Sequence, residues 1–177
     1  MKLSVVIPVY NEEKTVSELI RRVLAEKTQK EIIVVDDGSS DNTLKKIKAQ
    51  MSNVKTTTQK LKIISFGENQ GKGAAVRRGI QEATGDVLII QDVDLEYNPK
   101  DYQRLLKPII AGETEVVYGS RFKELRLKLF GKDKTPMPTH FLVNRFLSFL
   151  TNLLYGSKLT DIENRARNYG KDIKKRV

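Results

Sequence analysis

The 177-residue sequence predicts an α/β fold, a doubly wound and mostly parallel sheet with helices on both faces. Three observations support this. Short β-branched apolar runs alternate with segments whose apolar residues recur at helical spacing. The runs are nearly continuous, as in strands buried on both faces. Polar and glycine-rich clusters follow the runs, at the carboxyl ends of the strands, where sheets of this kind bind their ligands.

The N-terminal elements follow from this spacing. Leu3–Val9 is a β-branched run and predicts a buried strand. Acidic residues directly after Asn11 favour the first turn of a helix, whose apolar residues keep helical spacing as far as Leu24. Residues 31–35 predict a second buried strand, and residues 42–51 predict a short helix after it.

The same alternation continues along the chain. Residues 61–66 predict a third strand, and a glycine-rich turn connects it to a helix over residues 74–83. Residues 86–91 predict a fourth strand. Pro99 opens a further helix, because proline is tolerated at the first helical position, and residues 115–118 supply the last strand. Repeated strand–helix units imply right-handed crossovers and parallel strands.

Composition excludes several kinds of site. The sequence has no Cys and one His, so it offers no disulfide framework, no thiolate nucleophile and no multi-histidine metal centre. Any metal ion would therefore need oxygen ligands. The N-terminal residues lack a signal-peptide pattern and no apolar run is long enough to span a bilayer, so we expect neither a leader nor a membrane span.

The net charge of +10 is concentrated in the last third of the sequence. Residues 1–120 carry 18 Lys and Arg against 17 Asp and Glu, whereas residues 121–134 carry 6 against 2 and residues 165–177 carry 6 against 1. This asymmetry predicts a near-neutral binding domain followed by an anion-seeking part. We divide that part into an acceptor-side segment, residues 121–163, and a basic tail, residues 164–177, whose low apolar content favours mobility.

Asp92 and Asp94 give the sharpest functional signal. They stand at alternate positions directly after a predicted strand, and Glu96 follows two residues later. Carboxylates crowded at one edge repel each other unless a cation lies among them. Oxygen ligands of this kind suit Mg²⁺ or Mn²⁺. The alternative is a solvated acidic loop, but the buried strand before the pair favours a metal site.

Two more clusters follow other predicted strands. Asp36 and Asp37 end the second strand, where a carboxylate can accept hydrogen bonds from a ribose or a base; a capped turn is the alternative. Asn69 to Gly73 place Lys72 just before a helix, where a phosphate can bind. This spacing matches neither a Walker A loop nor the dinucleotide fingerprint, so a helix start with an exposed lysine is the alternative.

Residues after the first and last strands complete the set. Tyr10 can stack on a base and Glu12 can bond a nucleotide hydroxyl, although each taken singly is more often an ordinary loop residue. Arg121 follows the last strand, where a planar guanidinium suits a diphosphate. All the clusters fall at one edge of the predicted sheet. Their combined chemistry is that of a nucleoside diphosphate bound together with a divalent cation.

The ordered series of motifs resembles family 2 of the inverting glycosyltransferases, which have the GT-A fold, and in particular its polyprenyl-phosphate branch. The resemblance covers about residues 3–163. It is carried by V-I-P-V-Y-N-E at 6–12, D-D-G-S at 36–39, N-Q-G-K-G at 69–73, Q-D-V-D-L-E at 91–96 and V-Y-G-S-R-F at 117–122, and then by His140, Asn144, Arg145 and Asp161. The ordered series is far more specific than any one motif.

The resemblance implies a role for each matched residue. The metal ion would bind Asp92, Asp94 and Glu96, most directly through Asp94. The expected catalytic residues are Asp94, Arg121 and Asp161. The nucleotide sugar would be bound by Pro8, Tyr10, Glu12, Asp36, Asp37, Asn69, Gly71, Lys72 and Arg145.

The implied reaction moves a sugar from a nucleoside diphosphate sugar to a polyprenyl phosphate, with inversion and with a metal ion stabilising the leaving diphosphate. A phosphate acceptor is ionised near neutral pH and needs no strong base, whereas a hydroxyl acceptor would need Asp161 or Glu163. Two alternatives stay open: transfer to a glycan or other hydroxyl, and an incomplete, catalytically weak relative that binds nucleotide sugars. No nucleic-acid motif is present, so we expect no nucleic-acid partner.

The C-terminal part predicts contact with a membrane surface. Residues 141–155 are mostly apolar, too few to span a bilayer but enough for an interfacial helix; packing on the sheet is the alternative. The basic segment upstream, residues 121–134, favours anionic lipids, so we expect a peripheral protein at the cytoplasmic face of a membrane. After Glu163 the sequence departs from the family pattern, and we expect a shortened acceptor side.

Overall fold

A computed structural model describes residues 1–51, 60–95 and 97–118, the strand at 167–169, and six helical positions in between, at 143, 146, 147, 149, 150 and 153. The chain separates into two compact units. One consists of Met1–Val117 together with Ala166–Val177, and the other of Tyr118–Arg165. The first unit carries the parallel sheet.

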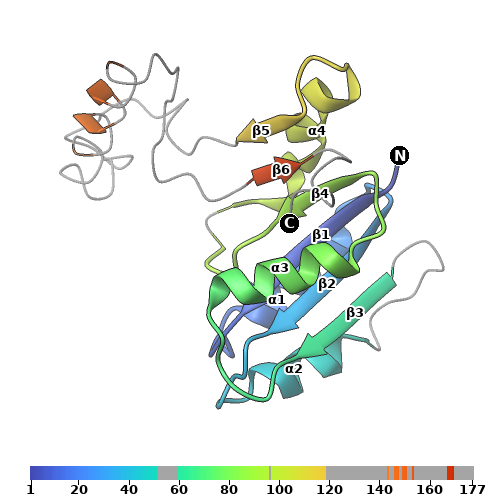
Figure 1. Cartoon of the computed structure of the whole chain (residues 1–177). Coiled ribbons are helices and arrows are strands. Elements are labelled where there is room, and N and C mark those ends of the chain that lie inside the picture. The colour runs from blue at the N-terminus through green and yellow to red at the C-terminus, as the bar shows by residue number, and fades with distance from the viewer. Residues whose placement is uncertain are drawn as a thin grey trace, which may run out of the picture. The chain divides into compact units, whose positions relative to one another are not determined.

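Four neighbouring strands of the sheet are parallel (Figure 1). β1 (Leu3–Val9) lies between β2 (Lys30–Asp36) and β4 (Val87–Ile90), and β3 (Lys60–Ser65) pairs with the other side of β2. The chain therefore moves outward from β1 through β2 to β3 and then returns to the opposite side of β1. Sheets of this kind bind ligands at the point where the strand order reverses, which here lies between β1 and β4.

The edge of the sheet beyond β4 contains an antiparallel strand. The strand order is β3-β2-β1-β4-β6-β5, and β6 (Arg167–Tyr169) pairs with β4 in the antiparallel sense, inside the edge strand β5 (Val116–Tyr118). Residues 167–169 of the predicted basic tail thus form a strand, which the sequence analysis does not anticipate. Their own sequence has little apolar pattern. These residues form a strand because they pair with the otherwise unpaired side of β4. Since β4 is distant in sequence, this pairing leaves no periodic pattern in the tail.

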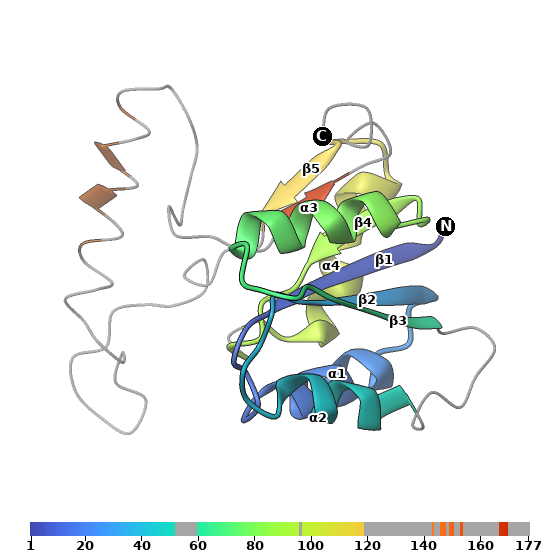
Figure 2. The ribbon, with the colours of Figure 1, turned by 60° about the horizontal axis from the view of Figure 1, so that its bottom comes forward.

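Helices cover both faces of the sheet (Figure 2). α1 (Val16–Ala25), α2 (Thr43–Gln50) and α4 (Tyr102–Ile110) share one apolar core with the strands. α3 (Lys72–Glu82) covers the opposite face. The predicted doubly wound α/β fold with helices on both faces is confirmed.

Alternate residues along a strand pack into the two apolar cores, one on each face of the sheet. On β1, Leu3, Val5 and Ile7 belong to the core under α1, whereas Val6 belongs to the core under α3. Gly79 lets α3 approach β1 closely, since a Cβ atom at this position would lie 2.3 Å from Val6 Cγ1. Both faces of the strand are thus buried, as its continuous apolar run predicts.

α1 begins at Val16, later than the acidic residues after Asn11 predict. Asn11 has a φ of 52°, outside the helical region. The backbone N–H groups of Glu12 and Glu13 donate to Thr43 Oγ1 and Asp41 Oδ2, at 2.8 and 3.2 Å. Side chains at the start of α2 thus hold this segment as a turn. A contact so distant in sequence is not visible in the local pattern.

A buried carboxylate joins the amino ends of the strands. Glu31 Oε1 accepts a hydrogen bond from Ser4 Oγ at 2.6 Å, and Oε2 accepts from Lys2 Nζ and Thr84 Oγ1, both at 2.7 Å. Burial acts to raise the pKa of Glu31, but the hydrogen bonds from Lys2, Ser4 and Thr84 outweigh it and lower the pKa to about 2. This cluster lies at the opposite ends of the strands from the polar residues described below.

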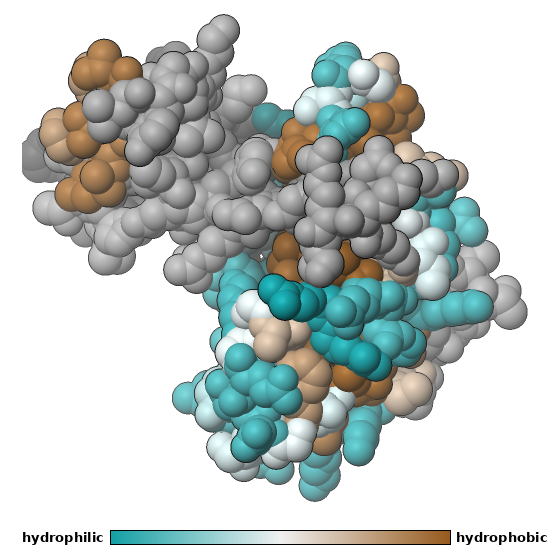
Figure 3. All heavy atoms as spheres, viewed as in Figure 1, coloured by the Kyte–Doolittle hydropathy of each residue, from teal (hydrophilic) through white to brown (hydrophobic). Residues whose placement is uncertain are grey.

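After Tyr118, the last residue of β5, the second unit is described only at apolar helical positions. Phe146, Phe149 and Leu153 are exposed to 62, 63 and 69%. Val143, Leu147 and Leu150 are exposed to 56, 38 and 38%. Figure 3 shows these side chains as brown spheres at the surface. Within the described part of the chain, no helix combines the length and apolar composition that crossing a bilayer requires.

Candidate functional site

The predicted polar residues gather at the carboxyl ends of the parallel strands. The backbone N–H of Asp37, just after β2, donates to Val9 O at 2.9 Å. On the other side of β1, the N–H of Gln91, just after β4, donates to Val6 O at 2.9 Å. The chain therefore leaves β2 and β4 on either side of the end of β1. Both acidic motifs begin at this edge.

Asp36 uses both carboxylate oxygens inside the protein. Oδ1 accepts a hydrogen bond from the backbone N–H of Ser39 at 3.3 Å, and Oδ2 accepts one from Ser65 Oγ at 2.9 Å. Its side chain is buried, with 1% of the residue exposed. Asp36 thus fastens the turn after β2 to the end of β3, which is a structural role.

Asp37 contacts the glycine-rich loop that precedes α3. It is also buried, and its Oδ1 accepts a hydrogen bond from the backbone N–H of Gln70 at 2.8 Å. The next residue, Gly38, has a φ of 71°, and a Cβ atom there would lie 2.5 Å from the carbonyl carbon of Glu68. Only glycine allows this approach. The loop with Asn69 and Gly71 is therefore packed against the Asp37 turn.

The loop delivers Lys72 to the acidic motif after β4. Gly71, with a φ of 90°, precedes the first residue of α3, which is Lys72. Lys72 Nζ lies 2.5 Å from Asp92 Oδ1 in an ion pair. The Lys72 side chain is 55% exposed, whereas that of Asp92 is 8% exposed. A solvent-accessible cation thus neutralises a buried carboxylate.

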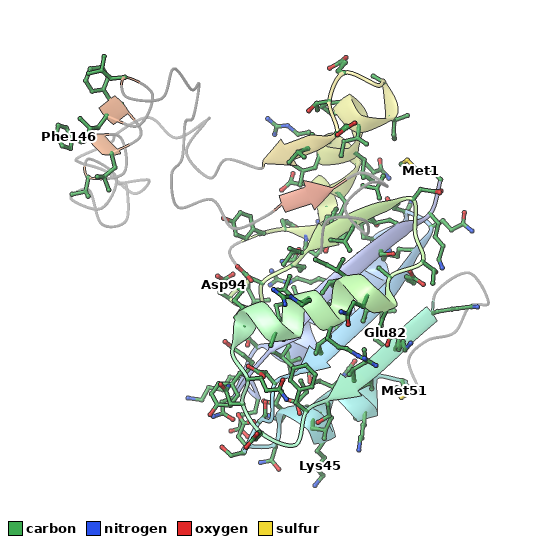
Figure 4. All side chains as sticks on the ribbon, viewed as in Figure 1. Met1, Lys45, Met51, Glu82, Asp94 and Phe146 are labelled. Atoms are coloured by element: carbon green, nitrogen blue, oxygen red, sulfur yellow. The ribbon has the colours of Figure 1, made fainter. Side chains whose placement is uncertain are left out.

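The second carboxylate oxygen of Asp92 is unsatisfied within the described part of the chain. Among the residues that the structure describes, Asp92 Oδ2 is buried and has no hydrogen-bond partner. Buried polar atoms normally have one, since desolvation without a partner costs free energy. Asp94 lies exposed two residues further on; Figure 4 labels it beside the N-terminal end of α3, with Glu82 at the other end of that helix. These oxygens suit a hard divalent cation.

Gln91 and Tyr102 hold the acidic loop and were missed by the sequence analysis. Gln91 Nε2 donates to Asp92 O at 2.9 Å and to Tyr97 O at 3.4 Å. Tyr102 Oη donates to Gln91 Oε1 at 2.9 Å. Burial, with a smaller effect of Glu26, raises the pKa of Tyr102, so its hydroxyl remains a donor. A glutamine ending a buried strand is the one local signal for this arrangement.

The residues after β1 occupy the same edge. Pro8 is buried within β1, and Tyr10, directly after the strand, is 47% exposed. Glu12 Oε2 accepts a hydrogen bond from Thr15 Oγ1 at 2.6 Å. Tyr10 therefore presents an accessible aromatic ring, while the carboxylate of Glu12 is engaged by the turn before α1.

Several predicted residues lie outside the described part of the chain. They are Glu96, Arg121, His140, Arg145, Asp161 and Glu163. Within the described residues, no group of three or more His, Cys, Asp or Glu side chains could hold a metal ion. The three-carboxylate metal site therefore remains a prediction, with Asp92 and Asp94 as its described members.

Comparison with known proteins decides the family. The pattern of Glycosyl transferase family 2 matches residues 4–167. The chain belongs to this family. Like other members of this family, it resembles structures of the GT-A fold. Glucosyl-3-phosphoglycerate synthase from Mycobacterium tuberculosis, solved with Mn²⁺, UDP and glucosyl-3-phosphoglycerate, matches it with a TM-score of 0.68 and 20% identity over 96% of this chain and 56% of that one. This likeness confirms the predicted GT-A fold.

Curated relatives of this chain include enzymes named for polyprenyl phosphates. Dolichol-phosphate mannosyltransferase from Pyrococcus furiosus is 36% identical over 124 residues, 69% of this chain and 34% of that protein. UDP-N-acetylglucosamine–dolichyl-phosphate N-acetylglucosaminyltransferase from Methanococcus voltae is 33% identical over 182 residues, 96% of this chain and 70% of that protein. The chain thus spans about a third of the first relative's length and 70% of the second's.

Proposed function

We propose that this family 2 glycosyltransferase moves a sugar from a nucleoside diphosphate sugar to a polyprenyl phosphate, with inversion and with the help of Mg²⁺ or Mn²⁺. One observation supports this most directly: the Asp37 turn, the Lys72 loop and the Asp92 motif are joined by hydrogen bonds at one sheet edge. Relatives of this chain are named as transferases to dolichyl and undecaprenyl phosphates. Their names suggest the acceptor.

The donor would lie across the carboxyl ends of β1, β2 and β4. The Asp37 carboxylate would accept hydrogen bonds from the nucleoside, and the exposed ring of Tyr10 would stack on the base. Lys72 would face the diphosphate, where the positive end of α3 adds to its charge. Arg121 and Arg145 are the proposed partners of the remaining phosphates of donor and acceptor.

Asp92 and Asp94 would hold the cation, together with Glu96. The buried, unpartnered Oδ2 of Asp92 fits such a role, since it has no other partner among the described residues. When bound, Mg²⁺ or Mn²⁺ supplies Lewis-acid stabilisation of the charge that develops on the leaving diphosphate. Gln91 and Tyr102 hold the backbone of this loop in place.

The proposed step is a single in-line displacement. An oxygen of the acceptor phosphate attacks the anomeric carbon from the face opposite the diphosphate, the carbon–oxygen bond to the donor breaks, and the configuration inverts. The phosphate nucleophile is ionised near neutral pH, so no residue has to remove a proton. A hydroxyl acceptor would require such a base, and Asp161 is the proposed residue for that alternative.

Peripheral attachment at the cytoplasmic face of a membrane would bring the enzyme to its acceptor. The exposed apolar residues at 143–153 suit an interfacial helix, and the basic segment 121–134 suits anionic lipids. Flotation with vesicles of phosphatidylglycerol and phosphatidylcholine tests this. Phe146→Glu should release the protein from the vesicles, and binding equal to that of the wild type would contradict the proposal.

Transfer itself is tested with purified protein, Mn²⁺, radiolabelled nucleotide sugars and undecaprenyl or dolichyl phosphate in detergent. We expect label in the organic phase with at least one donor. A parallel reaction with an added water-soluble glycan tests the alternative, and label on the glycan with none in the organic phase would favour a hydroxyl acceptor. Nucleotide binding by calorimetry without transfer or donor hydrolysis would mean that the protein only binds nucleotide sugars.

A further inference from the structure

The Lys72–Asp92 ion pair joins two side chains in very different surroundings. The Asp92 carboxylate is almost fully buried, and Lys72 reaches it from solvent at 2.5 Å. A buried carboxylate without a nearby cation is costly, so Lys72 stabilises Asp92 as the structure stands. The other Asp92 oxygen, Oδ2, has no hydrogen-bond partner among the described residues. Asp92 therefore has one oxygen bound to a replaceable cation and one available for another ligand.

We propose that Lys72 is an exchangeable counter-ion. It neutralises Asp92 before the donor binds, and it moves to the donor diphosphate when a divalent cation takes its place on Asp92. This inference rests on the proposed function, and it adds a competition between a side chain and a metal ion for the same carboxylate.

The surrounding structure lets the side chain move while the backbone stays in place. The loop before Lys72 is anchored, because Gln70 N–H donates to Asp37 and Glu68 packs against Gly38. Lysine carries a compact charge on a flexible four-carbon stem, so its ammonium group can change partners without a change in the backbone. More than half of the Lys72 side chain is exposed, which leaves room for that movement.

Charge balance couples the two ligands. A divalent cation arriving alone meets the positive charge of Lys72, whereas a cation arriving with a diphosphate brings a new anionic partner for Lys72. The wild type should therefore bind Mn²⁺ weakly alone and more tightly with a nucleoside diphosphate. Such coupling is reciprocal, so Mn²⁺ should raise the affinity for the nucleotide by the same factor.

The experiment measures free Mn²⁺ by electron paramagnetic resonance in titrations of the full chain, with no nucleotide present. Lys72→Met should bind Mn²⁺ about tenfold more tightly than the wild type, since removing one charge-assisted contact corresponds to roughly that factor. Lys72→Arg keeps the charge and should bind as weakly as the wild type. Lys45→Met makes the same charge change at an exposed position of α2 (Figure 4) and should behave like the wild type.

A double variant tests whether the gain in Mn²⁺ affinity arises at Asp92. Lys72→Met combined with Asp92→Asn should lose the tighter Mn²⁺ binding, and a gain that persists would overturn the proposal. With UDP or GDP added, the Mn²⁺ affinity of Lys72→Met should rise by a smaller factor than that of the wild type, because only the wild type also moves a lysine from Asp92 to the diphosphate. Mn²⁺ binding by Lys72→Met no tighter than by the wild type, including no binding by either, would also overturn it.

The transfer assay separates this inference from the proposed function. If the wild type forms labelled polyprenyl product but Lys72→Met binds Mn²⁺ no more tightly than the wild type, the proposed function is supported and the counter-ion exchange is contradicted. If Lys72→Met binds Mn²⁺ more tightly but the wild type transfers no sugar, the exchange is supported and the proposed function is contradicted.

Discussion

Asp37 Oδ1 accepts a hydrogen bond from the backbone N–H of Gln70 at 2.8 Å, and this contact joins the turn after β2 to the loop before α3. The loop continues directly into Lys72, whose Nζ contacts Asp92. The carboxylate proposed to bind the nucleoside and the carboxylate proposed to bind the cation are therefore connected through one short loop. A change at Asp37 should consequently affect more than nucleoside affinity.

Asp37→Asn and Asp37→Ala should differ in stability but not in donor binding. The asparagine oxygen can still accept from Gln70 N–H, whereas alanine removes the acceptor of this part-buried hydrogen bond and should lower the free energy of unfolding by about 1 kcal/mol. Both variants lose the charge proposed to bind the nucleoside. Thermal unfolding and calorimetry with UDP and GDP measure the two effects. Donor affinity equal to that of the wild type in Asp37→Asn would exclude the nucleoside role.

Asp94→Asn should abolish most of the transfer activity. It removes an anionic oxygen ligand from the proposed cation site, and losing such electrostatic stabilisation costs about 100-fold or more in rate. Asp101→Asn makes the same chemical change at an exposed position in the short 3₁₀ helix (Pro99–Asp101) before α4 and should leave the rate unchanged. Initial rates of lipid labelling at saturating Mn²⁺ compare the two, and equal rates would exclude a metal role for Asp94.

Tyr102→Phe should loosen the acidic loop without touching a ligand. The change leaves the buried Gln91 Oε1 without its hydroxyl donor, at a cost of about 1–3 kcal/mol in the free energy of unfolding. Because Gln91 also donates to Asp92 O, the Mn²⁺ concentration needed for half-maximal activity should rise. An Mn²⁺ requirement equal to that of the wild type would mean that Tyr102 supports only the core.

The Gln91–Tyr102 contact also shows where sequence patterns stop being informative. β1, β2 and β4 follow from β-branched runs because burial on both faces demands such residues. Parallel topology alone predicts that the polar motifs meet at one edge of the sheet, because parallel strands have their carboxyl ends at the same edge. The pairing of Gln91 with Tyr102, the ion pair of Lys72 with Asp92, and the addition of β6 to β4 depend on contacts between distant segments. Such contacts impose no periodicity on either partner.

Glu31 gives a prediction for the fold alone, at the strand ends away from the site. Its pKa in the folded protein is lowered from an ordinary value of 4.5 to about 2, so the charged form is stabilised by folding. The sign follows from proton binding: between these two values the unfolded chain binds more protons than the folded one, and stability rises with pH. The contribution is fully present above about pH 4.5 and is lost as the pH falls towards 2.

Glu31→Gln should therefore destabilise the protein most at neutral pH. A lowering of this size corresponds to about 3 kcal/mol, which is the expected growth of the difference in unfolding free energy between wild type and variant from pH 2 to pH 7. Denaturant unfolding followed by circular dichroism at several pH values measures it. Glu113→Gln, an exposed carboxylate after α4, should show little change across the same range. A difference for Glu31→Gln that is as large at pH 2 as at pH 7 would mean that shape and packing, rather than the charge of Glu31, hold the amino ends of these strands together.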